Sequence, residues 1–197
     1  MGFLYFCPWY ALPPMVFSLM TPLEIISKYY PEDNALRRLL IHHSLQVARR
    51  ALLVALSHPE LKLDCDFLYR ASMLHDIGIF LTDAPEIHCH GTQPYLIHGR
   101  LGAELMRREG DERTARVCER HTGTGLTADV IALRGIPLPS ADYSPQTLEE
   151  QVVCYADKFY SKSHPERERT VSQTAKSLEK FGATSVEKFM DWERRFG

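Results

Sequence analysis

The chain has 197 residues, of which 45% are hydrophobic and 24% charged, and its formal net charge is −2. This length supports one well-buried core, and so small a charge gives no electrostatic support for binding a nucleic-acid polymer. The five cysteines, an odd number without a CxxC pair, indicate a reducing environment rather than a disulfide framework. We therefore expect a single globular domain in the cytoplasm.

The first segment of the chain, "MGFLYFCPWYALPPMVFSL", carries no charged residue. It lacks the basic start of a signal peptide, and its prolines disfavour a membrane helix. In the following "MTPLEII", Thr21 suits the N-cap, Pro22 the first helical position, and Glu24 the third position of a capping box. We expect residues 1–20 to be a mis-called translation start or a disordered tail, with no membrane partner.

The rest of the chain has apolar residues at helical spacing, and no segment shows the alternation typical of strands. A second capping box is expected at Thr147 and Glu150. The stretch "TDAPEIHCHGTQP" is rich in turn-forming residues and is expected to be a loop. The pattern predicts an all-α fold with helices over about 33–57, 66–77, 95–110, 111–123, 127–134 and 147–162, and two more over about 165–196 separated by Gly182.

The stretch "ASMLHDIGIF" places His75 and Asp76 side by side in an apolar run. Buried charge is costly unless it is paired or coordinates a metal. Adjacent residues on a helix point about 100° apart, so they cannot chelate one ion as an i,i+4 pair does. They can converge on two ions above the helix end, where the histidine binds one ion and the carboxylate spans both.

The adjacent His42 and His43 are separated by helix phase. His43 has Leu39, Leu40 and Val47 as its helical neighbours and is expected to face the core. His42 has Arg38 and Gln46 in the equivalent places and is expected to lie nearer solvent. A lone core histidine is more often structural than a ligand. His43 is therefore a candidate metal ligand only if other ligand-type residues lie near it.

Three further polar residues, His98, His121 and Asp157, lie on or beside apolar helix faces. Each alone could be a hydrogen-bonded core residue. A shared metal site explains all of them at once. Imidazoles and carboxylates without a thiolate suit two divalent transition-metal ions such as Fe, Mn, Ni, Co or Zn rather than Mg or Ca.

Five motifs, "HHSLQVA", "MLHDIG", "LIHGRLGAEL", "RHTG" and "CYADK", match in order the H…HD…H…H…D pattern of the HD superfamily of metal-dependent phosphohydrolases. The resemblance covers roughly residues 36–162. It implies a helical bundle of the HD-domain type at 21–163, with 164–197 as C-terminal helices packed on the same domain. It also implies a dinuclear site, with Fe as the favoured metal. The first ion would be held by His43, His75 and Asp157, the second by His98 and His121, with Asp76 bridging both.

Within the superfamily the chain resembles the HDIG-type group, and distantly the bacterial symmetrical diadenosine tetraphosphate hydrolases. This implies hydrolysis of a nucleotide or other small phosphoester by a hydroxide that bridges the ions, with Asp76 as the catalytic carboxylate. Cations next to the ligand positions are candidates to bind phosphate, and so are hydroxyls in "HTGTG". These substrate-binding candidates are Arg120, Thr122, Thr124, Lys158 and Lys162.

Two other functions remain open at this stage. A mixed-valent di-iron oxygenase resembles the same ligand pattern, and iron accepts the same side chains. A catalytically silent nucleotide-binding protein could also keep the fold. The histidines of "HCH" (88–90) lack a fourth partner for a metal and are expected in a solvated loop or near the substrate. The sequence leaves open whether the protein forms a homodimer.

Overall fold

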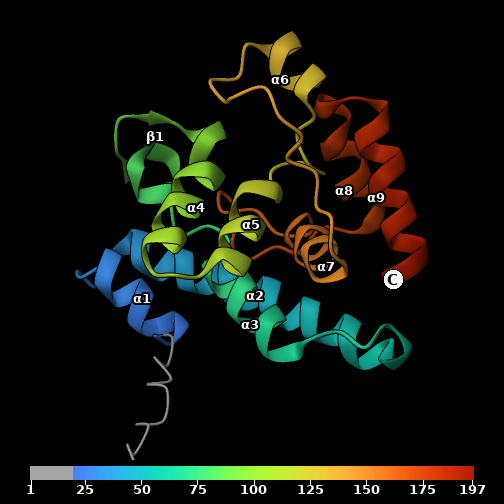
Figure 1. Cartoon of the computed structure of the whole chain (residues 1–197), viewed down its shortest axis with the longest axis horizontal. Coiled ribbons are helices and arrows are strands. Elements are labelled where there is room, and N and C mark those ends of the chain that lie inside the picture. The colour runs from blue at the N-terminus through green and yellow to red at the C-terminus, as the bar shows by residue number, and fades with distance from the viewer. Residues whose placement is uncertain (1–19) are drawn as a thin grey trace, which may run out of the picture.

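The computed structural model describes residues 20–197 and is predominantly helical, as the hydrophobic spacing predicts (Figure 1). Short 3₁₀ turns and a small three-stranded sheet connect some of the helices. In the described part of the chain, no helix is long and apolar enough to cross a membrane. The α-helices are α1 (Pro22–Tyr29), α2 (Ala35–Ser57), α3 (Cys65–Leu74), α4 (His98–Arg108), α5 (Glu112–Arg120), α6 (Ala128–Arg134), α7 (Leu148–Asp157), α8 (Val171–Leu178) and α9 (Ala183–Phe196).

The long helix α2 packs along α3, and α7 lies against both. Helix α2 begins at Asn34, whose side chain accepts a hydrogen bond from the Arg37 backbone N–H. Its apolar stripe, including Leu40 and Val47, is fully buried and divides between two hydrophobic clusters. Because His43 lies on this stripe between the two clusters' residues, the packing of α2 fixes its side chain toward the interior.

Helices α4 and α5 form an antiparallel hairpin that packs on α3 (Figure 1). Asp111 caps α5 by accepting from the Thr114 N–H at 3.0 Å, and it also accepts from Arg70 Nε on α3 at 2.6 Å. Two glycines, which lack a Cβ, allow α4 to lie close both to the turn after α3 and to α5. A Cβ at Gly78 would collide with the α4 backbone, and one at Gly99 with the Cys118 carbonyl of α5. The backbone of α4 therefore contacts the backbones of its neighbours directly at these two positions.

The C-terminal helix α9 packs its aromatic side chains against α7. Phe189 stacks on Tyr155 with ring centroids 5.8 Å apart, and Phe196 meets the same tyrosine edge-on at 5.6 Å. These rings are buried. The division into an HD domain at 21–163 and C-terminal helices at 164–197 packed on the same domain stays a prediction, and α9 shares its core with α7.

Helix α6 stands away from the other helices at the top of Figure 1. A cluster around Ile131 and Ile136 packs beneath it, together with Ile97 and Leu126. The Arg134 guanidinium donates to the Lys180 carbonyl in the 3₁₀ turn Glu179–Phe181. The α6 region is thus tied to the segment that follows α8.

Several predicted helix ends are wrong. Helix α3 stops at Leu74 rather than 77. The Ile77 N–H donates to the carbonyl three residues earlier, that of Leu74, and the Ile77 carbonyl accepts from the Tyr30 hydroxyl. Helix α7 stops at Asp157 rather than 162. The chain turns after it, and the Arg169 N–H donates to the Phe159 carbonyl. The first tail helix begins at Val171 rather than about 165, after the N-cap Thr170.

The predicted loop at 82–94 instead contains three short strands, β1 (Thr82–Ala84), β2 (Cys89–His90) and β3 (Gln93–Pro94). Strand β1 lies between an antiparallel β2 and a parallel β3. These strands are too short for alternation to be visible in the sequence. The predominantly helical class is unaffected.

Of the two predicted capping boxes, the one at Thr21 and Glu24 is confirmed. The one at Thr147 is only half formed. Thr147 accepts from the Glu150 N–H, but the Glu150 carboxylate bonds Arg116 and the Gln146 N–H instead of the cap. Apart from Met20, the expectation for residues 1–20 falls outside the described residues.

Candidate metal centre

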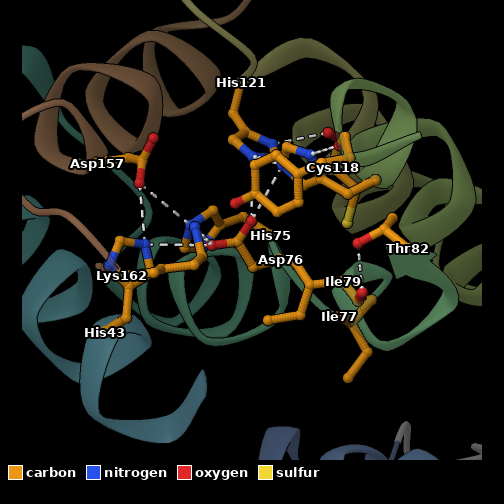
Figure 2. Close-up of polar contacts among 12 residues, drawn as sticks. His43, His75, Asp76, Ile77, Ile79, Thr82, Cys118, His121, Asp157 and Lys162 are labelled. Atoms are coloured by element: carbon orange, nitrogen blue, oxygen red, sulfur yellow. Dashed lines mark hydrogen bonds and ion pairs between the residues drawn. The ribbon is translucent and has the colours of Figure 1, made fainter. Parts of the chain in front are cut away.

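Five helices bring six ligand-type side chains to one point (Figure 2). His43 comes from the middle of α2. His75 and Asp76 follow directly after α3, and Asp157 is the last residue of α7. His98 is the first residue of α4, and His121 directly follows α5. The helix ends thus supply every member except His43, which is why side chains from helices in different directions can converge.

The first group consists of His43, His75, Asp76 and Asp157. His43 Nε2 lies 3.2 Å from Asp76 Oδ2 and 3.0 Å from Asp157 Oδ1. His75 Nε2 lies 2.9 Å and 3.5 Å from the same two oxygens. Two imidazoles and two carboxylates therefore face one small volume.

The second group consists of Asp76, His98 and His121. His98 Nε2 lies 3.2 Å and His121 Nε2 3.4 Å from Asp76 Oδ1, and the two nitrogens are 3.0 Å apart. The two oxygens of Asp76 thus face different groups. Figure 2 shows Asp76 between His43 and Asp157 on one side and His121 on the other.

Three of the imidazoles are oriented by backbone carbonyls. The Nδ1 atoms of His75, His98 and His121 each lie 2.7 Å from a carbonyl oxygen, of Ser72, Tyr95 and Cys118. Nδ1 therefore donates, and in the neutral ring that a metal would bind, Nε2 is left as the acceptor that points to the centre. This is the arrangement that fixes metal-binding histidines in other proteins.

The two groups differ in their electrostatics. Burial lowers the pKa of His75, but the Asp76 and Asp157 carboxylates more than offset it and raise that pKa to about 9. Burial lowers the pKa of His121 to about 4, and the Asp76 carboxylate 3.4 Å away opposes this only in part. Burial would raise the pKa of Asp76, yet the charges of His75 and Lys162 hold it well below the usual range. The first group contains two carboxylates, whereas Asp76 is the one carboxylate of the second group.

The cluster fits divalent metal ions. Asp76 is 0% exposed, and among the described residues neither of its oxygens has a hydrogen-bond donor with good geometry. The same holds for His75 Nε2. A buried carboxylate without well-aligned hydrogen bonds is costly even when it is paired with a lysine, as Asp76 is with Lys162, and two cations flanking Asp76 would satisfy both oxygens. Nitrogen and carboxylate donors without sulfur match transition-metal preferences.

A cavity of about 250 Å³ opens beside the centre, with His98, His121 and Asp157 in its wall. Of the residues predicted to bind substrate, it contains Thr122, Lys158 and Lys162. Lys158 Nζ lies 2.6 Å from Asp157 Oδ2, and Lys162 Nζ lies 2.5 Å from Asp76 Oδ2. The same cavity is lined by residues that sequence reasoning missed, among them Tyr95, Tyr160, Arg169, Ser177, Lys180 and Phe181.

Two predicted substrate residues, Arg120 and Thr124, do not line this cavity. The Arg120 side chain lies 3.6 Å from Glu150 and 3.7 Å from Glu119, so its charge is directed to carboxylates away from the centre. Thr124 is buried. His88 and His90 are exposed and belong to neither ligand group in the described chain.

The chain belongs to the HD domain family. The model of that family matches residues 40–161, which include all six converging side chains. Among solved structures, the HD domain of the phosphodiesterase PgpH from L. monocytogenes has a similar fold, with a TM-score of 0.50 and 17% identity over 86% of this chain and 93% of that one.

Curated relatives are similar over parts of their length. An uncharacterised protein of Methanocaldococcus jannaschii is 36% identical over 61% of this chain and 65% of its own length. Two proteins named tRNA (cytidine(56)-2′-O)-methyltransferase are also similar, from Thermoplasma volcanium (29% identical, 71% of this chain, 35% of that protein) and Picrophilus torridus (32% identical, 62% and 32%). This chain spans less than two thirds of each relative.

Proposed function

We propose that the chain is a dinuclear metal-dependent phosphohydrolase that acts on a nucleotide or other small phosphoester. The observation that carries this is the position of Asp76, whose oxygens each face a separate set of imidazoles. His43, His75 and Asp157 would hold one ion, His98 and His121 the other, and Asp76 both. When bound, two such ions lower the pKa of water and polarise phosphoryl oxygens for in-line displacement. Iron or manganese suits this donor set best.

The residues around the centre have separate tasks in this proposal. Lys158 and Lys162 present ammonium groups to the cavity and would bind the oxygens of the phosphate being transferred. Thr122 also lines the cavity, and its hydroxyl can donate to the same group. The carbonyls that hold Nδ1 of His75, His98 and His121 keep each Nε2 aimed at the centre throughout. The cavity volume of about 250 Å³ favours a small substrate group.

The direct test is turnover by metal-loaded protein. Metal-free protein is reloaded with Mn, Fe, Co or Ni and assayed with phosphomonoesters and phosphodiesters. We expect metal-dependent release of phosphate or monoester, lost in Asp76→Ala and retained in His42→Ala, which changes the exposed neighbour of His43. Wild-type protein that holds two ions and hydrolyses no phosphoester would contradict the proposal.

The oxygenase alternative has its own signature. Anaerobically purified protein would then show a stable Fe(II)/Fe(III) state in electron paramagnetic resonance that O₂ consumes. For the hydrolase we expect turnover to proceed without O₂ and with Mn in place of Fe. A reaction that requires O₂ would favour the oxygenase.

A further inference from the structure

The cavity beside the centre contains four cationic side chains and one carboxylate, that of Asp157. Two of the cations form ion pairs with carboxylates of the candidate metal centre, Lys158 with Asp157 and Lys162 with Asp76. These ion pairs hold both lysines beside the metal centre.

The other two cations, Arg169 and Lys180, have no carboxylate partner among the described residues. One Arg169 nitrogen donates to the Lys158 carbonyl at 3.3 Å, which holds the guanidinium at the cavity without neutralising it. The Lys180 ammonium lies 5.2 Å from the centroid of the Phe181 ring, and Arg134 binds the carbonyl of the same lysine. Their positive charge is therefore available to a ligand.

Both free cations lie outside residues 40–161, the part of the chain that matches the HD family. They come from the segment before α8 and the turn after it. Phe181 lies against the backbone of Gly123, where an added Cβ would be 3.6 Å from the ring. The C-terminal segment thus supplies part of the cavity wall and contacts the chain just after His121. A neighbouring hollow shares Arg169 and adds Arg167 and His164 without any carboxylate, so the positive surface continues outward.

We infer that the substrate carries a second phosphate group, held by Arg169 and Lys180 at the outer end of the cavity while the first lies at the metal centre. A charge-assisted contact to each cation supplies affinity that a monophosphate cannot use. The cavity volume of about 250 Å³ suits a compact bisphosphate or diphosphate group, with any larger portion directed outward. This inference rests on the proposed function for the role of the centre, but the binding of two phosphates can be measured without turnover.

Calorimetry of metal-loaded protein tests the inference. Orthophosphate and adenosine 5′-monophosphate are compared with pyrophosphate, whose phosphates are adjacent, and adenosine 3′,5′-bisphosphate, whose phosphates are apart. We expect at least one of the two-phosphate probes to bind roughly tenfold or more tightly than its one-phosphate counterpart. The two-phosphate probe that gains affinity indicates whether the bound phosphates are adjacent or apart. Equal affinity within each pair would overturn the inference.

Substitutions assign the effect to the residues. In Arg169→Gln/Lys180→Gln the advantage of the second phosphate should fall roughly tenfold, with one-phosphate binding almost unchanged. The control Arg108→Gln/Lys176→Gln removes the same charge from exposed positions outside the cavity and should keep the advantage. Lys180→Gln alone, at an exposed side chain, covers the case in which Arg169→Gln unfolds the protein. An unchanged advantage in these variants would overturn the assignment. Failure of hydrolysis in the turnover assay, with two-phosphate binding intact, would reject only the proposed chemistry.

Discussion

The two halves of the centre are built differently. The half formed by His43, His75 and Asp157 draws on the consecutive helices α2 and α3 and on the distant α7, which pack together in the main core. The half formed by His98 and His121 belongs to a single hairpin of α4 and α5. Apart from the shared Asp76, only the first half has a carboxylate. Asp157 adds to Asp76 in raising the pKa of His75 to about 9, whereas burial and the neighbouring imidazoles His75 and His98 lower the pKa of His121 to about 4.

Because the two halves differ in their carboxylates, we expect the two proposed ion positions to differ in affinity. An ion in the first half is balanced by two carboxylates, whereas an ion in the second half has one carboxylate that it shares. Coulomb attraction therefore favours the first position. A metal titration should show a tighter and a weaker step.

Loss of Asp76 gives the largest expected effect, because it belongs to both halves. Asp76→Ala should leave almost no bound ion and lower phosphoesterase activity by roughly 10³-fold. Elemental analysis and turnover measure both quantities. Asp83→Ala, which removes an exposed aspartate from β1, serves as the control and should keep both ions. If Asp76→Ala retained one full ion per chain, the shared role of Asp76 would be wrong.

Single ligands from each half should separate the two steps. His98→Ala or His121→Ala should leave about one ion per chain, bound with the tighter affinity, because the first half is intact. Asp157→Ala should also leave about one ion, but with the weaker affinity. Titration of each variant with Mn checks this. Equal loss of both ions in every variant would show that the division of ligands is wrong.

Asp111 supports the second half from a distance, since it caps α5 and pairs with Arg70. Asp111→Ala removes both interactions and should lower the free energy of unfolding by about 3 kcal/mol. Asp111→Asn keeps the cap and should cost less, about 1 kcal/mol. Denaturant unfolding measures both costs.

The same pair predicts a pH dependence. Burial would raise the pKa of Asp111, but bonds from Thr114 and Arg70 hold it below the ordinary value. A lowered folded pKa stabilises the protein above the unfolded pKa of about 3.9, and this stability is lost as the pH falls through the folded pKa. The stability difference between wild type and Asp111→Asn should therefore be full near pH 6 and vanish toward pH 2. A difference independent of pH would contradict this account.

The smallest effect is expected at His42, the exposed neighbour of His43. Its Nε2 lies 3.2 Å from the Pro165 carbonyl, which Gln46 also binds. His42→Ala should therefore change the free energy of unfolding by no more than about 0.5 kcal/mol and leave the metal content intact. His43→Ala should lose the first ion. Thermal midpoint and metal content of both variants decide this, and the reverse result would mean that His43 does not face the centre.

The sequence was most informative where a pattern repeats over several turns. Helix phase alone separates His43 from His42, and His43 is 1% exposed. The allocation of ligands to two groups followed from the family pattern, and the geometry brings the same residues together, although their roles remain proposals. What could not be predicted depends on the chain path beyond the helices. Arg169 and Lys180 reach the cavity because α7 ends early and the chain turns back, and no periodicity in "PERERTVSQTAKSLEKFG" marks that turn.

The close seating of the α4–α5 hairpin limits how this chain can evolve. A side chain at Gly78 would meet backbone atoms of Gly102 and His98, which no rotamer change can move. A mutation there must shift either α4, with His98, or the turn after α3 that carries Asp76. The glycine of the HDIG motif therefore sets how closely Asp76 and the second half of the centre approach each other. We expect a lineage that replaced this glycine to lose the proposed second ion position before the proposed first one.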